Sequence, residues 1–293
     1  MAISRDRLIA LIGLDEPTVE LVSTHVVQHS TYAVETLRLR LGDAEVRGLL
    51  TRPLKPEGRL PAILYAHSHG GGYAIGATEL LDGRTYLVDP LGPVFAHAGY
   101  VTLAIDMPVF GERSNVSESA AAKALLWMGK SLFGQMLSEQ AAALTYLASR
   151  ADVDPTRIGA FGISMGSTLS YWLAAMDPRL KAVAHLCCFA DQRTMIELGA
   201  HDGHGIYMTV PGLLAETDAG AIAALIAPRP QLVCLGEADK LTPPLAVARA
   251  WADLEPAYAA TPQNLQLVSE PGVGHQETPT SRAAMLEFFA RHL

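Results

Sequence analysis

A serine between two glycines is the strongest sign of chemistry in this chain of 293 residues. Residues 162–166 read Gly-Ile-Ser-Met-Gly; they follow an apolar run typical of a buried strand and precede a helical stretch that reaches Met176. A Gly-x-Ser-x-Gly sequence between a strand and a helix is typical of a nucleophile elbow, a strained turn that exposes the serine hydroxyl. We therefore predict that Ser164 is a nucleophile. An ordinary serine N-cap is the alternative interpretation.

A serine nucleophile needs a base, and the base needs a group that orients it. Downstream of Ser164, Asp239 follows the apolar run 231–235, and His275 follows the apolar run 265–268. Open parallel sheets place functional groups at the carboxyl ends of their strands, which is where both residues are expected. The order serine, acid, histidine therefore predicts a catalytic triad of Ser164, Asp239 and His275. Glu237 is the competing candidate for the acid.

Acyl transfer also requires an oxyanion hole made of N–H donors. The residue after the nucleophile, Met165, is expected to supply one backbone donor. The second is expected from the loop after the strand 62–66, which reads His-Ser-His-Gly-Gly-Gly-Tyr over residues 67–73. Glycines allow the backbone to approach a substrate oxygen closely. A phosphate-binding loop is the alternative, but the signatures of such loops are missing, so an oxyanion loop is favoured. Within it, we favour Gly70 and Gly71 as the donors.

Candidate residues for a substrate pocket lie next to these motifs. They are Tyr73 at the end of the glycine-rich loop, Trp127, and His204 in a segment rich in His, Gly and Asp. For Trp127, packing on the core is an equally good interpretation. His201 and His204 are spaced like metal ligands, but two histidines without a third ligand are weak support for a metal, so no metal site is predicted.

The elements that must position these residues follow a regular alternation. Continuous apolar runs, typical of strands buried on both faces, alternate with helical stretches, which indicates a parallel sheet with right-handed crossovers. The expected strands are 62–66, 100–105, 157–163, 181–188, 231–235 and 265–268, and the expected helices are 83–98, 131–149, 164–176, 244–254 and 278–292. Before them, the segments 35–41 and 46–51 flank Gly42-Asp43 and predict a β-hairpin. The fold class is therefore α/β, with a mostly parallel, doubly wound sheet, an N-terminal antiparallel hairpin and helices on both faces.

Two regions fall outside this alternation. Apolar residues at helical spacing predict that residues 1–30 form an N-terminal extension of two short helices, divided near Gly13 and Pro17. Residues 31–293 are expected to form a single domain. Within it, the stretches near 108–130 and 189–214 do not fit the strand–helix pattern, and long irregular insertions of this kind are typical of lids or binding loops.

These motifs together resemble those of the α/β-hydrolase superfamily, over about residue 35 to the C-terminus. The similarity is to the branch of dienelactone hydrolases and acetyl-xylan-esterase-like carboxylic ester hydrolases. It rests on the loop 67–73, on 106–114, on 153–166, on 227–243 and on the Gly-His pair that ends at His275. Dienelactone hydrolases carry a cysteine at the position of Ser164, so the resemblance implies an ordinary serine esterase rather than lactone chemistry.

The sequence thus predicts a hydrolase, independent of any cofactor, that cleaves small-molecule carboxylic esters through an acyl-enzyme. An amidase, peptidase or thioesterase with the same triad remains open, as does a non-catalytic binding protein of this fold. The 22 basic and 30 acidic residues give a net charge of −8 without a basic stripe, which disfavours nucleic acid as a partner. The apolar stretches are too short or too interrupted to span a membrane, and the N-terminus lacks a signal-peptide pattern. With its three cysteines expected to be buried free thiols, the protein is expected in the cytoplasm; its oligomeric state is left open.

Overall fold

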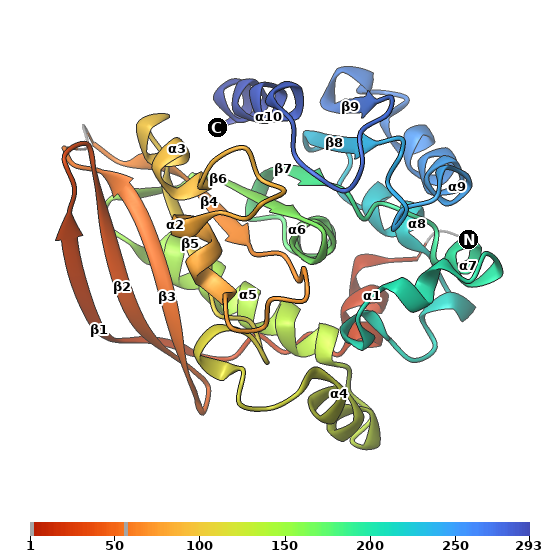
Figure 1. The fold of residues 1–293 in the computed structure, drawn as a ribbon, viewed down its shortest axis with the longest axis horizontal. Helices are drawn as coiled ribbons and strands as arrows, with labels where there is room; N and C mark the ends of the chain where they lie inside the picture. The colour runs from red at the N-terminus through yellow and green to blue at the C-terminus, as the bar shows by residue number, and fades with distance from the viewer. Residues whose placement is uncertain (1–2, 56–57) are drawn as a thin grey trace.

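One mixed sheet runs through the molecule, and Ser164, Asp239 and His275 follow the ends of three of its strands (Figure 1). The computed structural model describes residues 3–55 and 58–293, so residues 1–2 of the expected N-terminal extension, and 56–57, lie outside it. Within these ranges the strand order is β1-β2-β3-β5-β4-β6-β7-β8-β9. The strands are β1 (Val19–Gln28), β2 (Tyr32–Leu41), β3 (Ala44–Pro53), β4 (Leu60–Ala66), β5 (Val101–Ile105), β6 (Val153–Ile163), β7 (Leu180–Leu186), β8 (Gln231–Gly236) and β9 (Leu265–Glu270).

The six apolar runs identified in the sequence are the parallel strands β4 to β9. Their central members are buried along almost their whole length, because helices cover both faces of the sheet. The predicted hairpin is also confirmed: β2 and β3 are antiparallel, and Leu41 pairs with Ala44 across the Gly42-Asp43 turn. The predicted α/β architecture with an antiparallel N-terminal part is therefore correct.

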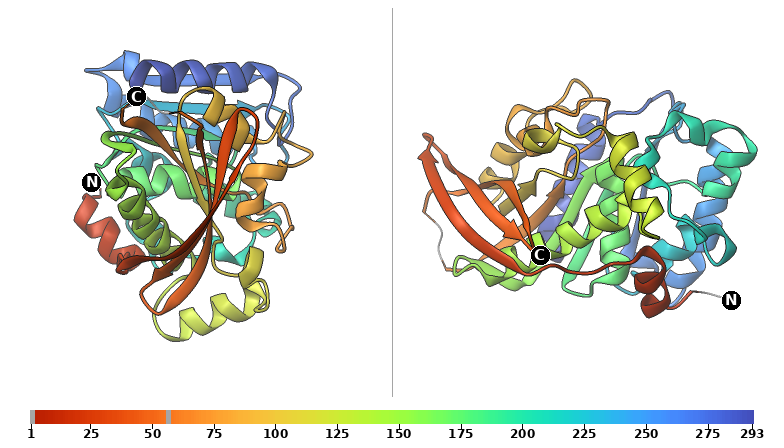
Figure 2. Two further views of the ribbon diagram at one scale, coloured as in Figure 1. Left: turned by 90° about the vertical axis from the view of Figure 1, so that its left-hand side faces the viewer. Right: turned by 90° about the horizontal axis from the view of Figure 1, so that it is seen from below.

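Helices form a layer on each side of the sheet, as the two perpendicular views of Figure 2 show. On one side, α1, α5, α6, α8 and α9 bury apolar side chains in the larger core, and on the other α2, α3 and α10 do so in a second core. No helix in the described ranges is both long and apolar enough to cross a membrane. The α-helices are α1 (Arg5–Ile12), α2 (Glu79–Asp82), α3 (Leu91–His97), α4 (Glu118–Trp127), α5 (Leu132–Ser149), α6 (Met165–Met176), α7 (Gln192–Glu197), α8 (Ala219–Ala224), α9 (Pro244–Leu254) and α10 (Pro279–His292).

The expected second helix of the N-terminal extension is wrong, because residues 19–28 form strand β1. β1 pairs with β2 along its length and forms one edge of the sheet. Its valines happen to recur at helical spacing, but its β-branched residues favour an extended chain, and pairing satisfies the backbone groups of β2. The first expected helix is correct: α1 begins after the Ser4 N-cap and ends at Gly13 in the left-handed conformation.

Three other segments differ in detail from the prediction. The helix expected over 83–98 is shorter, because Gly83 ends α2 at a φ of 66° and Pro90 precedes the start of α3. The first insertion contains α4, and the second contains α7 followed by short 3₁₀ turns, so neither is an irregular loop throughout. The 3₁₀ turns of the chain are Gly76–Thr78, Gly111–Arg113, Ala200–Gly203, Ile206–Met208, Leu213–Ala215, Glu255–Tyr258 and Pro262–Asn264.

Candidate active site

Ser164 occupies a strained turn between β6 and α6. Its backbone lies at φ 60° and ψ −120°, a conformation that L-residues rarely adopt. The flanking glycines are required by close packing: a Cβ on Gly166 would lie 1.9 Å from the carbonyl oxygen of Ala66, and one on Gly162 would lie 2.3 Å from Gly166. The Ser164 N–H donates to the carbonyl of Leu186 at 3.0 Å, which ties the turn to the end of β7. This is the geometry expected of a nucleophile elbow.

Asp239 and His275 meet beyond the ends of β8 and β9. The Nδ1 atom of His275 lies 2.7 Å from Oδ2 of Asp239. The carboxylate also accepts hydrogen bonds from the Leu241 N–H at 2.9 Å and from the Thr242 hydroxyl at 3.0 Å. Burial alone would raise the pKa of Asp239, but these hydrogen bonds and the neighbouring imidazole outweigh it and hold the pKa below its ordinary value. Asp239 is therefore a carboxylate that fixes one nitrogen of His275.

The two loops that carry this pair are held together through their backbones. The Ala238 N–H donates to the Val273 carbonyl at 2.8 Å, and the Glu237 N–H donates to the Glu270 carbonyl at 3.0 Å. A Cβ on Gly236 would lie 2.4 Å from the Gly274 carbonyl oxygen, so only glycine permits this approach. Backbone contacts rather than long side chains thus set the distance between the acid and the base.

The competing acid, Glu237, does not contact His275. Its side chain is exposed and accepts a hydrogen bond from Ser269 at 2.9 Å. The other ring nitrogen of His275, Nε2, is buried and has no hydrogen-bond partner among the described residues. Because Asp239 holds Nδ1, Nε2 is the nitrogen of His275 that can accept a proton from another group.

Ser164 and His275 line the same cavity, which has a volume of about 210 Å³. The loop 67–73 and the second insertion contribute the rest of its wall, through His69, Gly70, Gly71, Tyr86, Gly203, His204, Gly205, Tyr207 and Leu241. The predicted nucleophile, the predicted base, both predicted glycines and the predicted pocket residue His204 are thus brought together. Asp239 lies behind His275, buried to 3% exposure.

The candidate oxyanion donors differ in what their N–H groups already bind. Met165 is the first residue of α6, so its N–H has no acceptor within the helix. The N–H of Gly71 donates to Nδ1 of His69 at 3.1 Å, whereas the carbonyl of Gly70 accepts from Arg84. In the described part of the chain the N–H groups of Gly70 and His69 have no acceptor. Gly70 is therefore the better placed of the two predicted glycines, and His69 is a backbone candidate that the sequence did not suggest.

The other two predicted pocket residues lie away from the cavity wall. Tyr73 packs behind His69, with ring centroids 5.2 Å apart, and its hydroxyl donates to Glu118 at 2.6 Å. Trp127 is the last residue of α4, and its side chain is 92% exposed, so its predicted role in the pocket is wrong. Because α4 packs through the face that contains Ala122, Trp127 points to solvent.

His69 and Glu118 form a histidine–carboxylate pair at the site that the sequence did not indicate. His69 lines the cavity, and its Nε2 lies 2.8 Å from a carboxylate oxygen of Glu118 at the start of α4. Glu118 also accepts the N–H of Tyr207 at 2.7 Å. His69 belongs to the loop that the sequence singled out, but nothing in the spacing of Glu118 indicates that an insertion 49 residues away returns to this loop.

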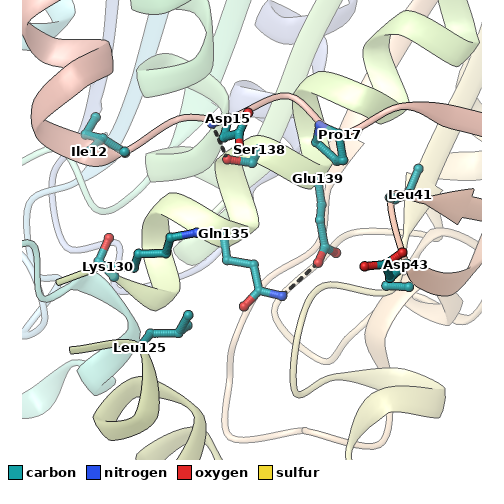
Figure 3. Close-up of a pocket in the computed structure, with 14 residues that line it drawn as sticks. Ile12, Asp15, Pro17, Leu41, Asp43, Leu125, Lys130, Gln135, Ser138 and Glu139 are labelled. Atoms are coloured by element: carbon teal, nitrogen blue, oxygen red, sulfur yellow. Dashed lines mark hydrogen bonds between the residues drawn. The ribbon is translucent and has the colours of Figure 1, made fainter. Parts of the chain in front are cut away.

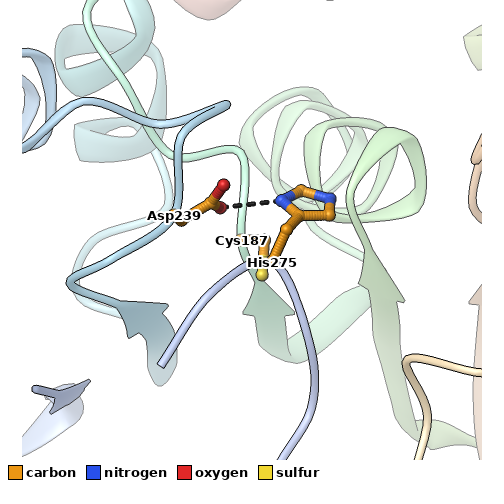
Figure 4. A group of neighbouring side chains, drawn as sticks. All are labelled: Cys187, Asp239 and His275. Atoms are coloured by element: carbon orange, nitrogen blue, oxygen red, sulfur yellow. Dashed lines mark hydrogen bonds and ion pairs between the residues drawn. The ribbon is translucent and has the colours of Figure 1, made fainter. Parts of the chain in front are cut away.

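Buried thiols surround the predicted triad. Sγ of Cys188 lies 3.8 Å from Oγ of Ser164, and the three cysteines are free and buried, as predicted. Burial raises the pKa of Cys188 to about 12 and that of Cys187 well above its ordinary value, so both remain protonated thiols. Figure 4 shows Cys187 beside the Asp239–His275 hydrogen bond.

Cys187, Asp239 and His275 have side-chain atoms within 4.8 Å of one another and form the one group with metal-ligand chemistry among the described residues. The group does not fit a metal ion well. The Nδ1 atom is already committed to Asp239, and the thiol would have to lose its proton in an apolar setting. The histidine pair of the sequence is not part of this group: His204 Nε2 lies 2.8 Å from the Leu241 carbonyl, and the side chain of His201 is exposed.

A larger hollow of about 370 Å³ lies elsewhere, between the end of α1, the β2–β3 turn and the start of α5 (Figure 3). Two hydrogen bonds join residues of its wall: the Asp15 N–H donates to Ser138 at 3.0 Å, and Gln135 donates to Glu139 at 3.0 Å. It contains none of the predicted site residues. The first of these hydrogen bonds attaches the segment after α1 to α5.

Comparisons with known proteins agree with the fold. The model of the prolyl oligopeptidase family matches residues 93–293. A Bacillus subtilis (strain 168) protein named "Putative hydrolase YtaP" is 36% identical over 294 residues, which cover 99% of this chain and 98% of that protein. Acetyl xylan esterase from Paenibacillus sp. R4 superposes with a TM-score of 0.70 at 20% identity, over 99% of this chain and 93% of that one. Acetyl xylan esterase 1 from Thermoanaerobacterium sp. JW/SL YS485 superposes with a TM-score of 0.68 at 19% identity, over 98% of this chain and 92% of that one.

The two solved structures are too distant in sequence to show more than a shared fold, and that fold is the predicted one. The family match covers the strands and loops that carry Ser164, Asp239 and His275. The chain belongs to the prolyl oligopeptidase family of α/β hydrolases.

Proposed function

We propose that the protein hydrolyses small carboxylic esters with Ser164 as nucleophile, His275 as general base and acid, and Asp239 as the residue that orients His275. The observation that carries the proposal is the 2.7 Å contact between Asp239 and Nδ1 of His275, with Nε2 left unpartnered beside the cavity that Ser164 lines. A carboxylate on Nδ1 keeps the proton there, so Nε2 is free to accept the serine proton.

The reaction proceeds in two halves. Ser164 Oγ attacks the ester carbonyl carbon while His275 Nε2 takes the hydroxyl proton, which gives a tetrahedral oxyanion. The N–H groups of Met165 and of the loop at Gly70 stabilise this charge. The C–O bond to the alcohol then breaks, and the imidazolium gives its proton to the leaving alcohol. Water, deprotonated by His275, attacks the acyl-enzyme; the acid leaves and Ser164 regains its proton.

The size of the cavity favours a short acyl group. Its volume of about 210 Å³ lies below the range of roughly 300–1,000 Å³ that is usual for sites of drug-sized ligands. The names of the two structural neighbours, acetyl xylan esterases, are consistent with a small acyl group, although their identity to this chain is low. We therefore expect acetate-sized groups to be preferred over long fatty acyl groups.

The test is the turnover of p-nitrophenyl acetate by the purified protein and by Ser164→Ala. The matched control is Ser170→Ala on the same helix, whose hydroxyl has no hydrogen-bond partner among the described residues. We expect Ser164→Ala to lose at least about 10³-fold in kcat and the control to retain wild-type activity. Equal activity of Ser164→Ala and wild type, or no activity of the wild type on any ester, would overturn the proposal.

The bond that is cleaved is tested with substrates that share one acyl group. An acetyl ester, an acetyl thioester and an acetanilide present the same carbonyl to the same oxyanion donors. We expect the ester to have the highest kcat/KM. A higher kcat/KM for the anilide than for the ester would identify an amidase or peptidase. A higher kcat/KM for the thioester would identify a thioesterase. A chain-length series from acetate to octanoate tests the size argument separately, with a fall of kcat/KM expected.

A further inference from the structure

A buried glutamate connects the oxyanion loop to both insertions. Glu118 is 5% exposed and stands at the first position of α4. One carboxylate oxygen accepts from His69 Nε2 at 2.8 Å and from the Tyr73 hydroxyl at 2.6 Å. The other accepts from the N–H of Tyr207 at 2.7 Å. Residues from three distant parts of the chain thus converge on one carboxylate beside the cavity.

Glu118 is charged in this setting. Burial would raise its pKa, but the hydrogen bonds from His69, Tyr73 and the Tyr207 backbone outweigh burial and hold the pKa below its ordinary value. A carboxylate accepts hydrogen bonds and donates none. The space around it is also filled: a Cβ on Gly205 would lie 2.6 Å from Glu118 Oε1 and 3.0 Å from His69 Nε2.

This charge fixes the tautomer of His69. Because Nε2 faces a carboxylate, Nε2 must carry a proton. Nδ1 accepts the N–H of Gly71 at 3.1 Å, so Nδ1 must be unprotonated. The ring is also stacked on Tyr207, with centroids 5.5 Å apart and planes at 25°, which prevents it from turning over freely. His69 is therefore neutral, with its single ring proton directed at Glu118.

The tautomer in turn decides which N–H groups of the loop remain free. Gly71 donates to His69 Nδ1, Gly72 donates to the His69 carbonyl at 3.0 Å, and Ser68 donates to Glu79 at 2.8 Å. In the described part of the loop this leaves the N–H groups of His69 and Gly70 without an acceptor. If Nδ1 carried the proton, it would oppose the Gly71 N–H, and the loop would have to change its conformation.

We propose that Glu118 is a positioning residue for the oxyanion hole: through the tautomer of His69 it holds the Gly71 N–H in place, so that the loop presents the Gly70 end to the substrate oxygen. This inference rests on the proposed function, because it assigns the loop to that reaction. It makes His69 and Glu118 a second histidine–carboxylate pair beside the cavity that His275 also lines. In the proposed reaction this second pair acts on the oxyanion, whereas the pair of His275 and Asp239 acts on the nucleophile.

The first test is Glu118→Gln, which keeps the side-chain shape. The Gln carbonyl must take the place of the oxygen that accepts from the Tyr207 N–H, which can only donate. The amide nitrogen then takes the place of the oxygen that faces His69 Nε2 and the Tyr73 hydroxyl, and drives the ring proton to Nδ1. The loop then loses its acceptor for Gly71. We expect kcat for p-nitrophenyl acetate to fall by about 10–10²-fold with KM changed less than about threefold, because an oxyanion contact acts mainly in the transition state. Glu287→Gln, an exposed glutamate on α10, is the matched control and should leave kcat unchanged.

A double-mutant cycle separates this mechanism from simple support of α4. In His69→Asn, the Asn carbonyl can take the place of Nδ1 as the acceptor of the Gly71 N–H, without any tautomer to control. We expect His69→Asn to keep more activity than Glu118→Gln, and Glu118→Gln to cost less than about threefold in the His69→Asn background. An equal loss in both backgrounds would show that Glu118 acts by packing alone and would overturn the proposal.

The tautomer itself can be observed without activity. Long-range ¹H–¹⁵N NMR of Ser164→Ala, with the His69 signals identified by their loss in His69→Asn, distinguishes a protonated Nε2 from a protonated Nδ1. We expect Nε2–H in Ser164→Ala and Nδ1–H after Glu118→Gln is added. A proton on Nδ1 in the parent, or no change in the variant, contradicts the proposal even if the protein is an active esterase. The expected tautomers in a protein that hydrolyses no ester would instead leave the pair in place and refute only the proposed function.

Discussion

The substitution Asp239→Asn tests the role of Asp239 in orienting His275 while it leaves the other residues of the site in place. Asparagine has the shape of aspartate, and its single side-chain oxygen must stay where Oδ1 lies, because the Leu241 N–H, 2.9 Å away, can only donate. The amide nitrogen therefore takes the place of Oδ2, 2.7 Å from Nδ1 of His275 and 3.0 Å from Thr242 Oγ1. A donor there forces Nδ1 to become an acceptor and moves the ring proton to Nε2.

A protonated Nε2 cannot take the serine proton, so the loss is nearly that of the base itself. In serine hydrolases with this arrangement the corresponding change costs about 10⁴-fold in kcat. That factor is about 5 kcal/mol of transition-state stabilisation. Binding of the ester in the cavity does not depend on the tautomer, so we expect KM to change much less than kcat.

The assay is initial-rate turnover of p-nitrophenyl acetate, with the fold checked by circular dichroism and thermal unfolding. The matched control is Glu237→Gln, the same acid-to-amide change two residues away, on an exposed side chain that contacts Ser269 rather than His275. We expect the control to retain wild-type kcat. A loss of less than tenfold in a folded Asp239→Asn protein, or an equal loss in the control, would refute the assignment of Asp239.

Further predictions concern the packing of the elbow, the thiol next to it and a buried ion-pair cluster. In Gly166→Ala the new Cβ would lie 1.9 Å from the Ala66 carbonyl oxygen, so we expect the free energy of unfolding, measured by urea titration, to fall by about 3 kcal/mol or more. A urea midpoint equal to that of the wild type would contradict this expectation. Because burial raises the pKa of Cys188 to about 12, the native protein should resist iodoacetamide until it is unfolded, and rapid labelling of the native protein at pH 8 would argue against it. Burial alone would raise the pKa of Glu35, but hydrogen bonds from two arginines outweigh burial and lower the pKa below its ordinary value. The charged form of Glu35 therefore stabilises the folded protein above the unfolded-state pKa of about 4.3, and this stabilisation is lost as the pH falls through the folded-state pKa. Glu35→Gln should therefore lower the free energy of unfolding by about 2 kcal/mol at pH 7 and by less below pH 4, and a difference independent of pH would exclude this cause.

The parallel sheet and the placement of Ser164, Asp239 and His275 at the ends of its strands could be predicted because their signals are local. A strand buried on both faces is apolar at every position, as in β5 and β8, and the elbow needs its two glycines in the sequence itself. Asp239 and His275 follow the ends of strands, and parallel pairing of β8 with β9 brings those ends together. The topology thus converts sequence order into spatial proximity.

The edge strand β1 is predicted as a helix because an edge strand lacks the continuous apolar pattern of a buried strand. The side chains of β1 are almost all exposed, so its pattern is not shaped by burial, and its valines fall by coincidence at helical spacing. The strand exists because β2 offers it partners on both sides of one irregularity between Leu21 and Ser23. Pairing of this kind depends on residues elsewhere in the chain and cannot be read from the segment alone.

The walls of the cavity depend on how the insertions fold back. A tryptophan is a residue type typical of pockets, but Trp127, at the end of α4, is exposed to solvent. The residue of α4 that contacts the loop 67–73 is Glu118, at the start of the helix. A glutamate at the start of a helix usually indicates capping or the helix dipole. Its hydrogen bond to His69 arises from tertiary packing, for which the sequence carries no periodic signal.

The identity of the nucleophile is tested most directly by covalent capture. The purified protein is treated with a fluorophosphonate, and the adduct is located by intact mass and by mass spectrometry of its peptides. We expect one adduct per chain, on Ser164, at a rate that falls sharply in His275→Ala, because the attacking hydroxyl needs the base. No adduct on the folded protein, or an adduct on another residue that persists in Ser164→Ala, would contradict a serine hydrolase built on Ser164.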